Sequence, residues 1–343
     1  MQVEEIRAMR LHKQHLIIPV SMDVAVRDLC GVQAQFLSNA MHALRIRCHD
    51  FDPALAQEQL VKSWTLRGTM HVFAREDLPL MLHKGRTHFL RSCDKLEADE
   101  CISKERKGFF AELILQRVRG GAVTREELRE LCAANGMTET ESLSLFDAWG
   151  GVIRALCEEG SICHVVREKK AYQLAPAFEP REKETAETEL ARRYFTHYGP
   201  ATVRDAAYFF GATQKRVKGW LDRLPVESFQ CEGREYFHIP CEQDEAADVP
   251  ACLFLAGFDP LMLGYEKKDS LFLPAEHLRG IFNLAGIVMP ALLLHGRVVG
   301  RWKKEKKLNI SLFETLDAKQ RSEVEQAARR LWGEAEPICF TKM

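Results

Sequence analysis

The sequence predicts an α+β protein built from several small modules. At 343 residues the chain is long enough for roughly two to four small domains. Three stretches repeat one plan, in which helices are followed by a short β ribbon, and after Pro250 the pattern changes to strands. We therefore expect three tandem helix–ribbon units scaffolded by a β-rich, barrel-like C-terminal module, with boundaries at 1–104, 105–180, 181–245 and 246–343.

The first unit is the least regular of the three. Helices are predicted at 4–15, 23–30 and 53–62, the last with Asp52 as its N-cap and Pro53 in its first turn. These cap residues make its start the best-defined boundary of the unit.

A single strand is predicted over 64–73, and a helix over 76–86. Apolar and polar residues alternate along this strand, which places one face in a core and leaves the other as a row of hydrogen-bonding groups. The apolar set is Trp64, Leu66, Met70 and Val72, and the polar set is Thr65, Arg67, Thr69 and His71. We expect Trp64 to be a core residue.

The second unit shows the repeated plan most clearly. A helix over 108–119 ends at two glycines, and Thr124 with Glu127 forms a capping box that opens a helix through Ala134. A third helix is expected from residue 139, with an apolar stripe of Phe146, Trp149, Ile153 and Leu156. A hairpin of strands 162–166 and 171–174 follows, and this order of elements is that of a winged helix.

The third unit, over 185–239, contains a helix-turn-helix signal. Thr202 starts one helix, Gly211 lies in a tight turn, and Thr213 starts the next helix. The second helix is expected to bury Val217, Trp220 and Leu221 and to expose Gln214, Lys215, Lys218 and Arg223. Strands 226–230 and 235–238 would form the wing.

The C-terminal module is predicted to consist of strands joined by short turns. Strands are expected at 251–256, 287–294, 297–303, 307–313 and 337–341, with a hairpin turn at 295–296 and an amphipathic helix over 317–332.

Composition indicates an ordinary globular protein, with 46% hydrophobic and 28% charged residues. The charged N-terminus lacks a signal peptide, and the longest apolar stretch, 286–294, is too short to cross a bilayer, so we expect a soluble cytoplasmic protein. The 11 cysteines have irregular spacing, which favours free thiols that pack as small hydrophobic residues. We expect neither a metal site nor a cofactor.

The formal net charge is −1, which gives no support to non-specific nucleic-acid binding. The local charge is nevertheless uneven. One basic cluster comprises Lys215, Arg216, Lys218 and Arg223, and a second comprises Arg297, Arg301, Lys303, Lys304, Lys306 and Lys307. Each cluster is either a set of phosphate contacts or a solvated charged face.

The most informative run is 31–45, which contains Gln33 and Gln35. Side chains at i and i+2 lie about 200° apart on a helix but on one face of an extended segment. Because the preceding residues look helical and Gly31 fits a helix stop, we expect the two amides to lie on an extended stretch. Together they could hold a water molecule, although surface glutamines in a loop are the alternative.

Four runs together resemble the winged-helix DNA glycosylases of the AlkZ/YcaQ type. They are Gly-Val-Gln-Ala-Gln (31–35), Ser-Trp-Thr-Leu-Arg-Gly-Thr-Met-His (63–71), Gly-Phe-Asp-Pro-Leu-Met-Leu-Gly-Tyr (257–265) and the run 285–302. The resemblance implies tandem winged helices with a C-terminal β-barrel and cleavage of the N-glycosidic bond of alkylated purines in DNA. In some members it implies unhooking of interstrand crosslinks. Gln33 and Gln35 match the Gln-x-Gln motif of the AlkZ branch.

Individual residues can now be given expected roles. Gln33 and Gln35 would be catalytic, holding the attacking water. DNA contacts would come from Arg67, His71, Lys215, Arg216, Lys218, Arg301, Lys303 and Lys304. For Arg67 and His71 a structural hydrogen-bond network is an equal alternative. Asp259 is either a turn residue or a polar group near the site, and Tyr265 is either core or DNA-facing.

The predicted function is that of a monofunctional DNA glycosylase for cationic alkylated purines, with the unhooking of interstrand crosslinks left open as a further activity. The partner would be double-stranded DNA, bound by a monomer acting in the bacterial cytoplasm, at the nucleoid. Two alternatives remain open: a non-catalytic winged-helix regulator or lesion sensor, and an interaction scaffold that binds protein.

Overall fold

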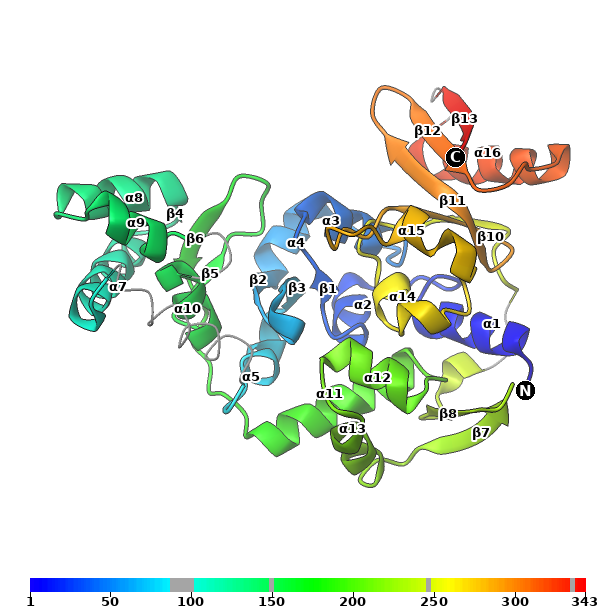
Figure 1. Cartoon of the computed structure of the whole chain (residues 1–343), viewed down its shortest axis with the longest axis horizontal. Coiled ribbons are helices and arrows are strands. Elements are labelled where there is room, and N and C mark those ends of the chain that lie inside the picture. The colour runs from blue at the N-terminus through cyan, green and yellow to red at the C-terminus, as the bar shows by residue number, and fades with distance from the viewer. Residues whose placement is uncertain (87–101, 148–150, 245–247, 334–336) are drawn as a thin grey trace. The chain divides into compact units, whose positions relative to one another are not determined.

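The computed structural model describes residues 1–86, 102–147, 151–244, 248–333 and 337–343 (Figure 1). The chain forms two compact units. The discontinuous unit comprises Met1–Phe51 and Thr188–Met343, and the inserted unit comprises Asp52–Glu187. Both mix helices with strands, which confirms the α+β class. The finer division into four modules stays a prediction.

The first two strands of the inserted unit form a β-hairpin in place of the single strand that we expected. Strands β2 (Leu60–Trp64) and β3 (Met70–Ala74) pair antiparallel, with Trp64 opposite Met70. A 3₁₀ turn, Leu66–Gly68, reverses the chain, because Arg67 and Gly68 have φ values of 55° and 65°. The single-strand prediction was wrong because alternation suits two short strands as well as one long strand.

The hairpin belongs to a sheet with the order β3-β2-β5-β6-β4. The later strands are β4 (Val123–Thr124), β5 (Ile162–His164) and β6 (Ala171–Leu174), and the β5–β6 hairpin is confirmed. Trp64, Phe110, Leu128 and Leu156 share one core cluster beside this sheet. The 60–74 hairpin is therefore packed together with the second helix–ribbon unit.

Six helices accompany this sheet in the described part of the inserted unit (Figure 1). They are α4 (Pro53–Gln59), α5 (Leu78–Met81), α7 (Lys104–Arg119), α8 (Arg125–Ala134), α9 (Glu139–Leu145) and α10 (Gly151–Glu159). The Asp52 cap and the Thr124–Glu127 capping box are confirmed. The helix expected over 76–86 is only a 3₁₀ turn, Arg75–Asp77, followed by α5.

The prediction of one continuous third helix in the second unit was wrong. The segment forms two helices, α9 and α10, and Gly151 at the start of α10 has a φ of 73°. Phe146, Ile153 and Leu156 are buried as expected, whereas Trp149 lies outside the described residues. Apolar spacing continued across the break, so periodicity alone did not mark it.

The discontinuous unit contains the helix-turn-helix that the sequence predicts. Its helices are α1 (Val3–Lys13), α2 (Met22–Asp28), α3 (Leu37–Arg45), α11 (Lys183–His197), α12 (Val203–Phe210) and α13 (Gln214–Leu221). Thr202 and Thr213 cap the last two, and Gly211 takes the left-handed conformation between them. The wing is a hairpin of β7 (Glu227–Cys231) and β8 (Arg234–His238).

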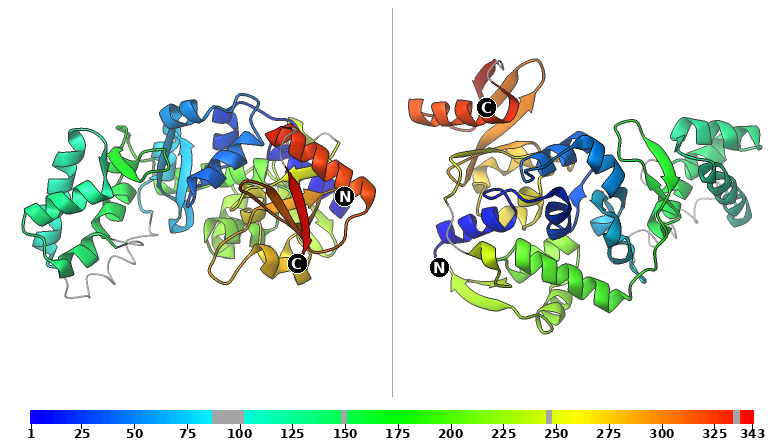
Figure 2. Two further views of the ribbon diagram at one scale, coloured as in Figure 1. Left: turned by 90° about the horizontal axis from the view of Figure 1, so that it is seen from above. Right: turned by 180° about the vertical axis from the view of Figure 1, so that it is seen from behind.

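The C-terminal module is an open sheet with the order β13-β12-β11-β10-β9. The strands are β9 (Cys252–Phe254), β10 (Ala291–Leu294), β11 (Arg297–Lys304), β12 (Leu308–Leu312) and β13 (Ile338–Lys342). Helix α16 (Ala318–Trp332), at the red end of the colour range in Figure 2, packs against this sheet through Val324, Ala327 and Ala328. The expected barrel is not closed, because β9 and β13 remain the two edges.

Short elements complete the described chain. They are β1 (Val32–Gln33), α14 (Pro260–Leu263), α15 (Leu278–Ile281) and the 3₁₀ turns Glu242–Asp244, Lys267–Asp269 and Ala275–His277. The cysteines in the described ranges form no disulfide bonds, and Cys30, Cys132, Cys157 and Cys252 are buried, as expected. Among the described helices, none combines the length and the apolar character that a membrane span requires.

Candidate active site around Gln33 and Gln35

The glutamine segment begins where α2 ends. The last hydrogen bond of this helix end runs from the Gly31 N–H to the Val26 carbonyl, at 2.8 Å. Two successive residues, Cys30 and Gly31, have positive φ values of 54° and 79°. The helix therefore stops at Asp28, two residues before the predicted end, and a left-handed pair turns the chain into β1.

Gln33 and Gln35 lie on either side of a buried alanine. Gln33 is the last residue of β1, and Ala34 has no exposed surface. Both glutamines are half-buried. Burial alternates along this run, because Val32 and Ala34 are buried and the two glutamines are only half-buried. Gln33 lies in the strand, and Gln35 lies in the bend that precedes α3. The extended conformation at Gln33 is confirmed.

Helix α3 follows directly and is anchored on the C-terminal sheet. The His42 Nε2 atom lies 2.8 Å from the Phe254 carbonyl, and the His42 ring lies 4.9 Å from Trp302 and 6.0 Å from Trp332. Burial lowers the pKa of His42, so the imidazole is neutral at neutral pH. Arg45 adds a 2.8 Å hydrogen bond to the Leu331 carbonyl. These contacts fix the helix that starts two residues after Gln35.

The turn at 257–259 packs against the start of the same helix. The Phe258 ring lies 5.9 Å from the Phe36 ring, and Phe258 has a φ of 57°. A Cβ atom on Gly257 would come within 2.6 Å of the Asn39 amide nitrogen, so glycine permits this close approach. Two of the sequence motifs thus meet at Phe36 and Asn39.

Asp259 is a turn residue, and it also forms a buried ion pair. It caps α14 by accepting a hydrogen bond from the Leu261 N–H at 2.9 Å. Its two oxygens lie 2.6 and 3.1 Å from the guanidinium of Arg47, and both side chains have no exposed surface. Arg47 also donates to the carbonyls of Gln14 and Ala43. Sequence reasoning missed Arg47, because nothing in its neighbourhood distinguishes it from a surface arginine.

Tyr265 is a core residue rather than a DNA-facing one. Its hydroxyl accepts a hydrogen bond from the Gln14 amide at 2.9 Å and donates to the Tyr198 carbonyl at 2.9 Å. The Arg10 guanidinium lies 3.7 Å from the centre of its ring. Burial raises the pKa of Tyr265 well above the usual range, so the phenol stays protonated.

In the inserted unit, Arg67 and His71 occupy different environments. Arg67 is half-buried at the tip of the hairpin turn. His71 is 3% exposed on β3, and its Nδ1 atom lies 3.0 Å from the Thr65 hydroxyl and 3.1 Å from the Thr69 carbonyl. Burial lowers the pKa of His71 to about 3, so the ring carries no charge for a phosphate. The hydrogen-bond network is the role that this geometry supports for His71.

Trp64 is buried in the core, as expected, and the Arg154 guanidinium lies 4.4 Å from the centre of its ring. This stacking leaves Trp64 as a packing residue of the inserted unit.

The basic residues of the helix-turn-helix lie on the predicted face of α13. Lys215 and Lys218 are exposed, and Arg216 is half-buried with its guanidinium 6.0 Å from the Trp220 ring. Val217, Trp220 and Leu221 are buried. The predicted division of this helix into a core face and a charged face is confirmed.

On β11, Arg301 and Lys303 alternate with Trp302 and Lys304. Trp302 donates a 2.9 Å hydrogen bond to the Leu255 carbonyl, which places its face of the strand toward the core. Lys303 forms a 2.6 Å ion pair with Glu305 at the exposed hairpin end. Arg301 and Lys303 therefore share the opposite face of the strand.

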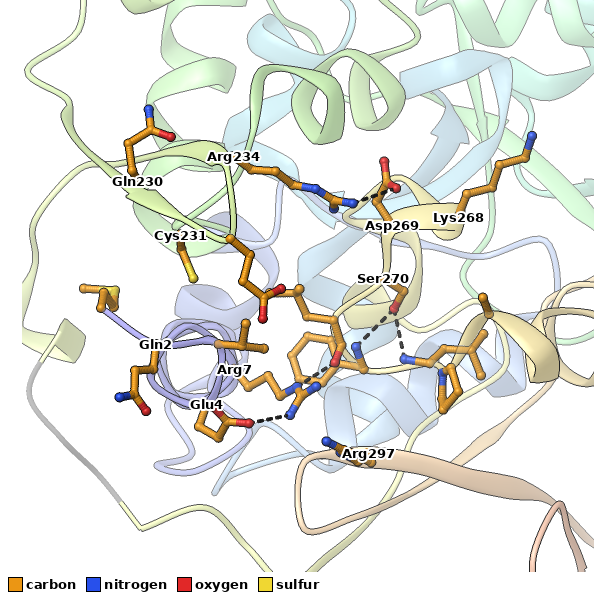
Figure 3. Close-up of a pocket in the computed structure, with 18 residues that line it drawn as sticks. Gln2, Glu4, Arg7, Gln230, Cys231, Arg234, Lys268, Asp269, Ser270 and Arg297 are labelled. Atoms are coloured by element: carbon orange, nitrogen blue, oxygen red, sulfur yellow. Dashed lines mark hydrogen bonds and ion pairs between the residues drawn. The ribbon is translucent and has the colours of Figure 1, made fainter.

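A cavity of about 780 Å³ lies elsewhere in the discontinuous unit (Figure 3). Arg7, Arg234 and Arg297 line it, but none of the predicted site residues does. Arg7 donates to the Leu271 carbonyl at 2.5 Å, and Arg234 pairs with Asp269 at 3.2 Å. Burial and the nearby Arg297 lower the pKa of Arg7. This cavity is distinct from the glutamine segment.

Comparison with known proteins decides the family. The family model for "DNA glycosylase AlkZ-like" matches residues 26–333, which include Gln33, Gln35 and Asp259. The chain belongs to the AlkZ-like DNA glycosylase family. It is accordingly an enzyme that hydrolyses N-glycosidic bonds in DNA.

Two comparisons with single proteins agree with this assignment. The chain is 29% identical over 331 residues to an interstrand DNA cross-link repair glycosylase of Streptomyces sahachiroi, with 87% of each chain covered. Its fold is similar to the solved structure of Streptomyces sahachiroi DNA glycosylase AlkZ, with a TM-score of 0.79 and 24% identity, covering 99% of this chain and all of that one. The family membership and the α+β class expected from the sequence are confirmed, whereas the C-terminal sheet module is not a closed barrel.

Proposed function

We propose that this AlkZ-like glycosylase releases cationic alkylated purines from double-stranded DNA, with a water held between Gln33 and Gln35. The observation that carries the proposal is the placement of two half-buried amides on either side of the fully buried Ala34. An amide oxygen accepts a hydrogen bond from water and orients it. We therefore assign the two amides as acceptors for one water.

Amide chemistry also restricts the substrate. A glutamine is not a strong base, so it cannot generate hydroxide, and the leaving group must already be activated. A purine alkylated at N7 or N3 carries a positive charge and leaves without protonation. Positioning of the water and electrostatic stabilisation of the sugar cation then supply the catalysis. Undamaged purines are expected to be inert.

The neutral state of His71 fits this scheme. A cationic leaving group needs no general acid, and a histidine with a pKa of about 3 does not supply one at neutral pH. DNA contacts are assigned to Arg67, to Lys215, Arg216 and Lys218 on α13, and to Arg301, Lys303 and Lys304 on β11.

Unhooking of interstrand crosslinks is part of the proposal. The Streptomyces sahachiroi relative is named an interstrand DNA cross-link repair glycosylase. Crosslinks through purine N7 atoms are also cationic alkylated purines, so the same water would attack them. No lysine lies near Gln33 in sequence, so we assign hydrolysis without a lyase step, leaving an intact abasic site.

The test is base release from duplex DNA that contains N7-methylguanine, followed by alkaline cleavage of the abasic site. Gln35→Ala is expected to lower the single-turnover rate by about 10²–10³-fold, the usual cost of one preorganised polar contact. Gln173→Ala is the matched control, because Gln173, on β6, is half-buried like Gln35 but lies outside the glutamine segment.

Equal release by wild type and a Gln33→Ala/Gln35→Ala double variant would place the site elsewhere. A duplex with a single N7–N7 crosslink is the second substrate. Release of methylguanine without unhooking would remove the crosslink part of the proposal and leave the water mechanism intact.

A further inference from the structure

The ends of three helices bring together two histidines and an aspartate. His15 follows α1, Asp28 ends α2, and His197 ends α11. The His15 Nε2 atom lies 2.8 Å from one Asp28 oxygen, and the His197 Nε2 atom lies 3.3 Å from the other. The three ligand atoms all lie within 4.8 Å of one another. From these contacts we propose that His15, Asp28 and His197 bind a zinc ion.

The spacing of the three groups is close to that of a tetrahedral site. Bonds of about 2.0–2.1 Å from zinc to nitrogen or oxygen separate neighbouring ligand atoms by about 3.3–3.5 Å. Two of the separations here, 2.8 and 3.3 Å, lie within about 0.7 Å of that range. Two imidazoles and one carboxylate form a common zinc ligand set, and water takes the fourth position.

The burial of the cluster suits a metal with one open position. The His15 side chain is 2% exposed, whereas those of Asp28 and His197 are 19% and 13% exposed. One side of the cluster therefore reaches solvent, which gives an ion a route in and leaves room for a water ligand.

The electrostatics of the cluster also favour a cation. The C-terminal ends of α1 and α11 carry partial negative charge, which adds to the charge of Asp28. Lys13 at the end of α1 is a cation, and its ammonium is paired with Asp244 at 2.5 Å.

The backbone at His15 supports a specific role for the side chain. His15 has a φ of 60°, in the left-handed position after a helix that glycine usually occupies. A residue with a Cβ atom is disfavoured in that conformation. A gain from the imidazole, such as metal binding, offsets that cost.

The ion would be structural rather than catalytic. Asp28 lies five residues before Gln33, and only the Leu29–Gly31 turn and Val32 lie between them. Fixing the end of α2 to α1 and α11 therefore fixes the start of the glutamine segment. Sequence reasoning excluded metal because it searched for local spacing, and His197 lies far from His15 and Asp28 in the chain.

The test is a Co²⁺ titration of full-length, tag-free, metal-stripped protein. We expect one equivalent to bind, with visible d–d absorption typical of a four-coordinate site, and Zn²⁺ to displace it. Asp28→Asn and His197→Asn are each expected to weaken binding by about 100-fold or more, since losing a direct ligand costs at least as much as losing its supporting partner. Circular dichroism reports whether each variant folds.

The matched control is His295→Asn. His295 forms a 2.8 Å contact with Glu323, like the His15–Asp28 pair, but it is not part of a three-ligand group in the described residues. This variant is expected to bind Co²⁺ like wild type. If a cluster variant fails to fold, the titration of the wild-type protein is sufficient to test the zinc site. Absence of stoichiometric binding, or binding unchanged in folded Asp28→Asn and His197→Asn, would overturn the zinc site.

Discussion

At the scale of single residues, the buried ion pair of Arg47 and Asp259 predicts a large effect on stability. The pair has no exposed surface, and the remaining polar atoms of both side chains bond to backbone groups. Removing one partner of such a pair leaves a buried charge without compensation. We expect Arg47→Ala to lower the free energy of unfolding by about 3–5 kcal/mol in urea titrations.

Arg27→Ala provides the comparison for this experiment. Arg27 pairs with Asp23 at 3.5 Å on the surface, with 42% and 54% of their side chains exposed. Its loss should cost under about 1 kcal/mol. Similar costs for the two variants would mean that the buried pair contributes no more than a surface pair.

The burial of His71 predicts that the stability of the fold depends on pH. Burial lowers the pKa of His71 to about 3, below the value of about 6.5 for an unfolded chain. Between these values the unfolded state binds a proton that the native state does not, so stability falls as the pH drops below 6.5. The loss from this group should reach about 2 kcal/mol at pH 5.

The measurement is the free energy of unfolding between pH 5 and 8 for wild type and His71→Gln. The variant should show a shallower decrease toward pH 5, whereas His49→Gln, which replaces an exposed histidine, should keep the wild-type slope. An NMR titration of the His71 ring should find it neutral at pH 5. A protonated ring at that pH would contradict the prediction.

At the scale of elements, replacement of glycine by alanine is expected to have opposite effects on stability at two positions. Gly219 lies within α13, and a Cβ atom there would meet nothing within 4 Å. Gly219→Ala should therefore stabilise the protein by about 0.5–1 kcal/mol, because alanine favours the helix. Gly300 on β11 faces the β12 backbone, and its Cβ atom would come within 2.3 Å of the Ser311 carbonyl oxygen.

Gly300→Ala should destabilise by about 1–3 kcal/mol, because a backbone carbonyl cannot move aside as a side chain can. Thermal unfolding of both variants, followed by circular dichroism, measures the two effects. Changes of the same sign would show that the close approach of β11 and β12 does not limit the side chain at position 300.

The elements also show where sequence reasoning succeeds. Cap and turn residues gave the correct start of α4 and correct boundaries for α8 and α12, because their side chains bond to the helix itself. The helix predicted over 53–62 ends at Gln59, because the next residues form β2. Periodicity failed at 64–73 and at 139–156, where a turn interrupts a pattern that continues in space. In both places a glycine with positive φ, Gly68 or Gly151, was the available signal.

At the scale of the whole molecule, DNA binding must come from local charge. The net charge is −1, so we expect affinity to depend on a few basic residues rather than on an overall field. Each lost phosphate contact should reduce the slope of log K against log salt by about 0.9. Lys215→Gln/Lys218→Gln should therefore lower the slope by about 2 if both residues contact DNA.

Lys319→Gln/Lys342→Gln is a charge-matched control that removes two lysines outside the predicted clusters. Fluorescence anisotropy with a duplex at several salt concentrations gives both slopes. An unchanged slope for the α13 variant would make that face a solvated surface and leave the DNA contacts to Arg67 and β11.

The sequence by itself determined the family, the α+β class, the helix-turn-helix and the candidate glutamine pair, because these depend on local caps, periodicity and motif residues. The tertiary structure alone decided that Arg47 pairs with Asp259, that Tyr265 is core, that His71 is neutral and that the C-terminal sheet is open. It also brought His15, Asp28 and His197 together. These features depend on contacts between residues distant in the chain, where burial sets the charge of each group and no local pattern records it.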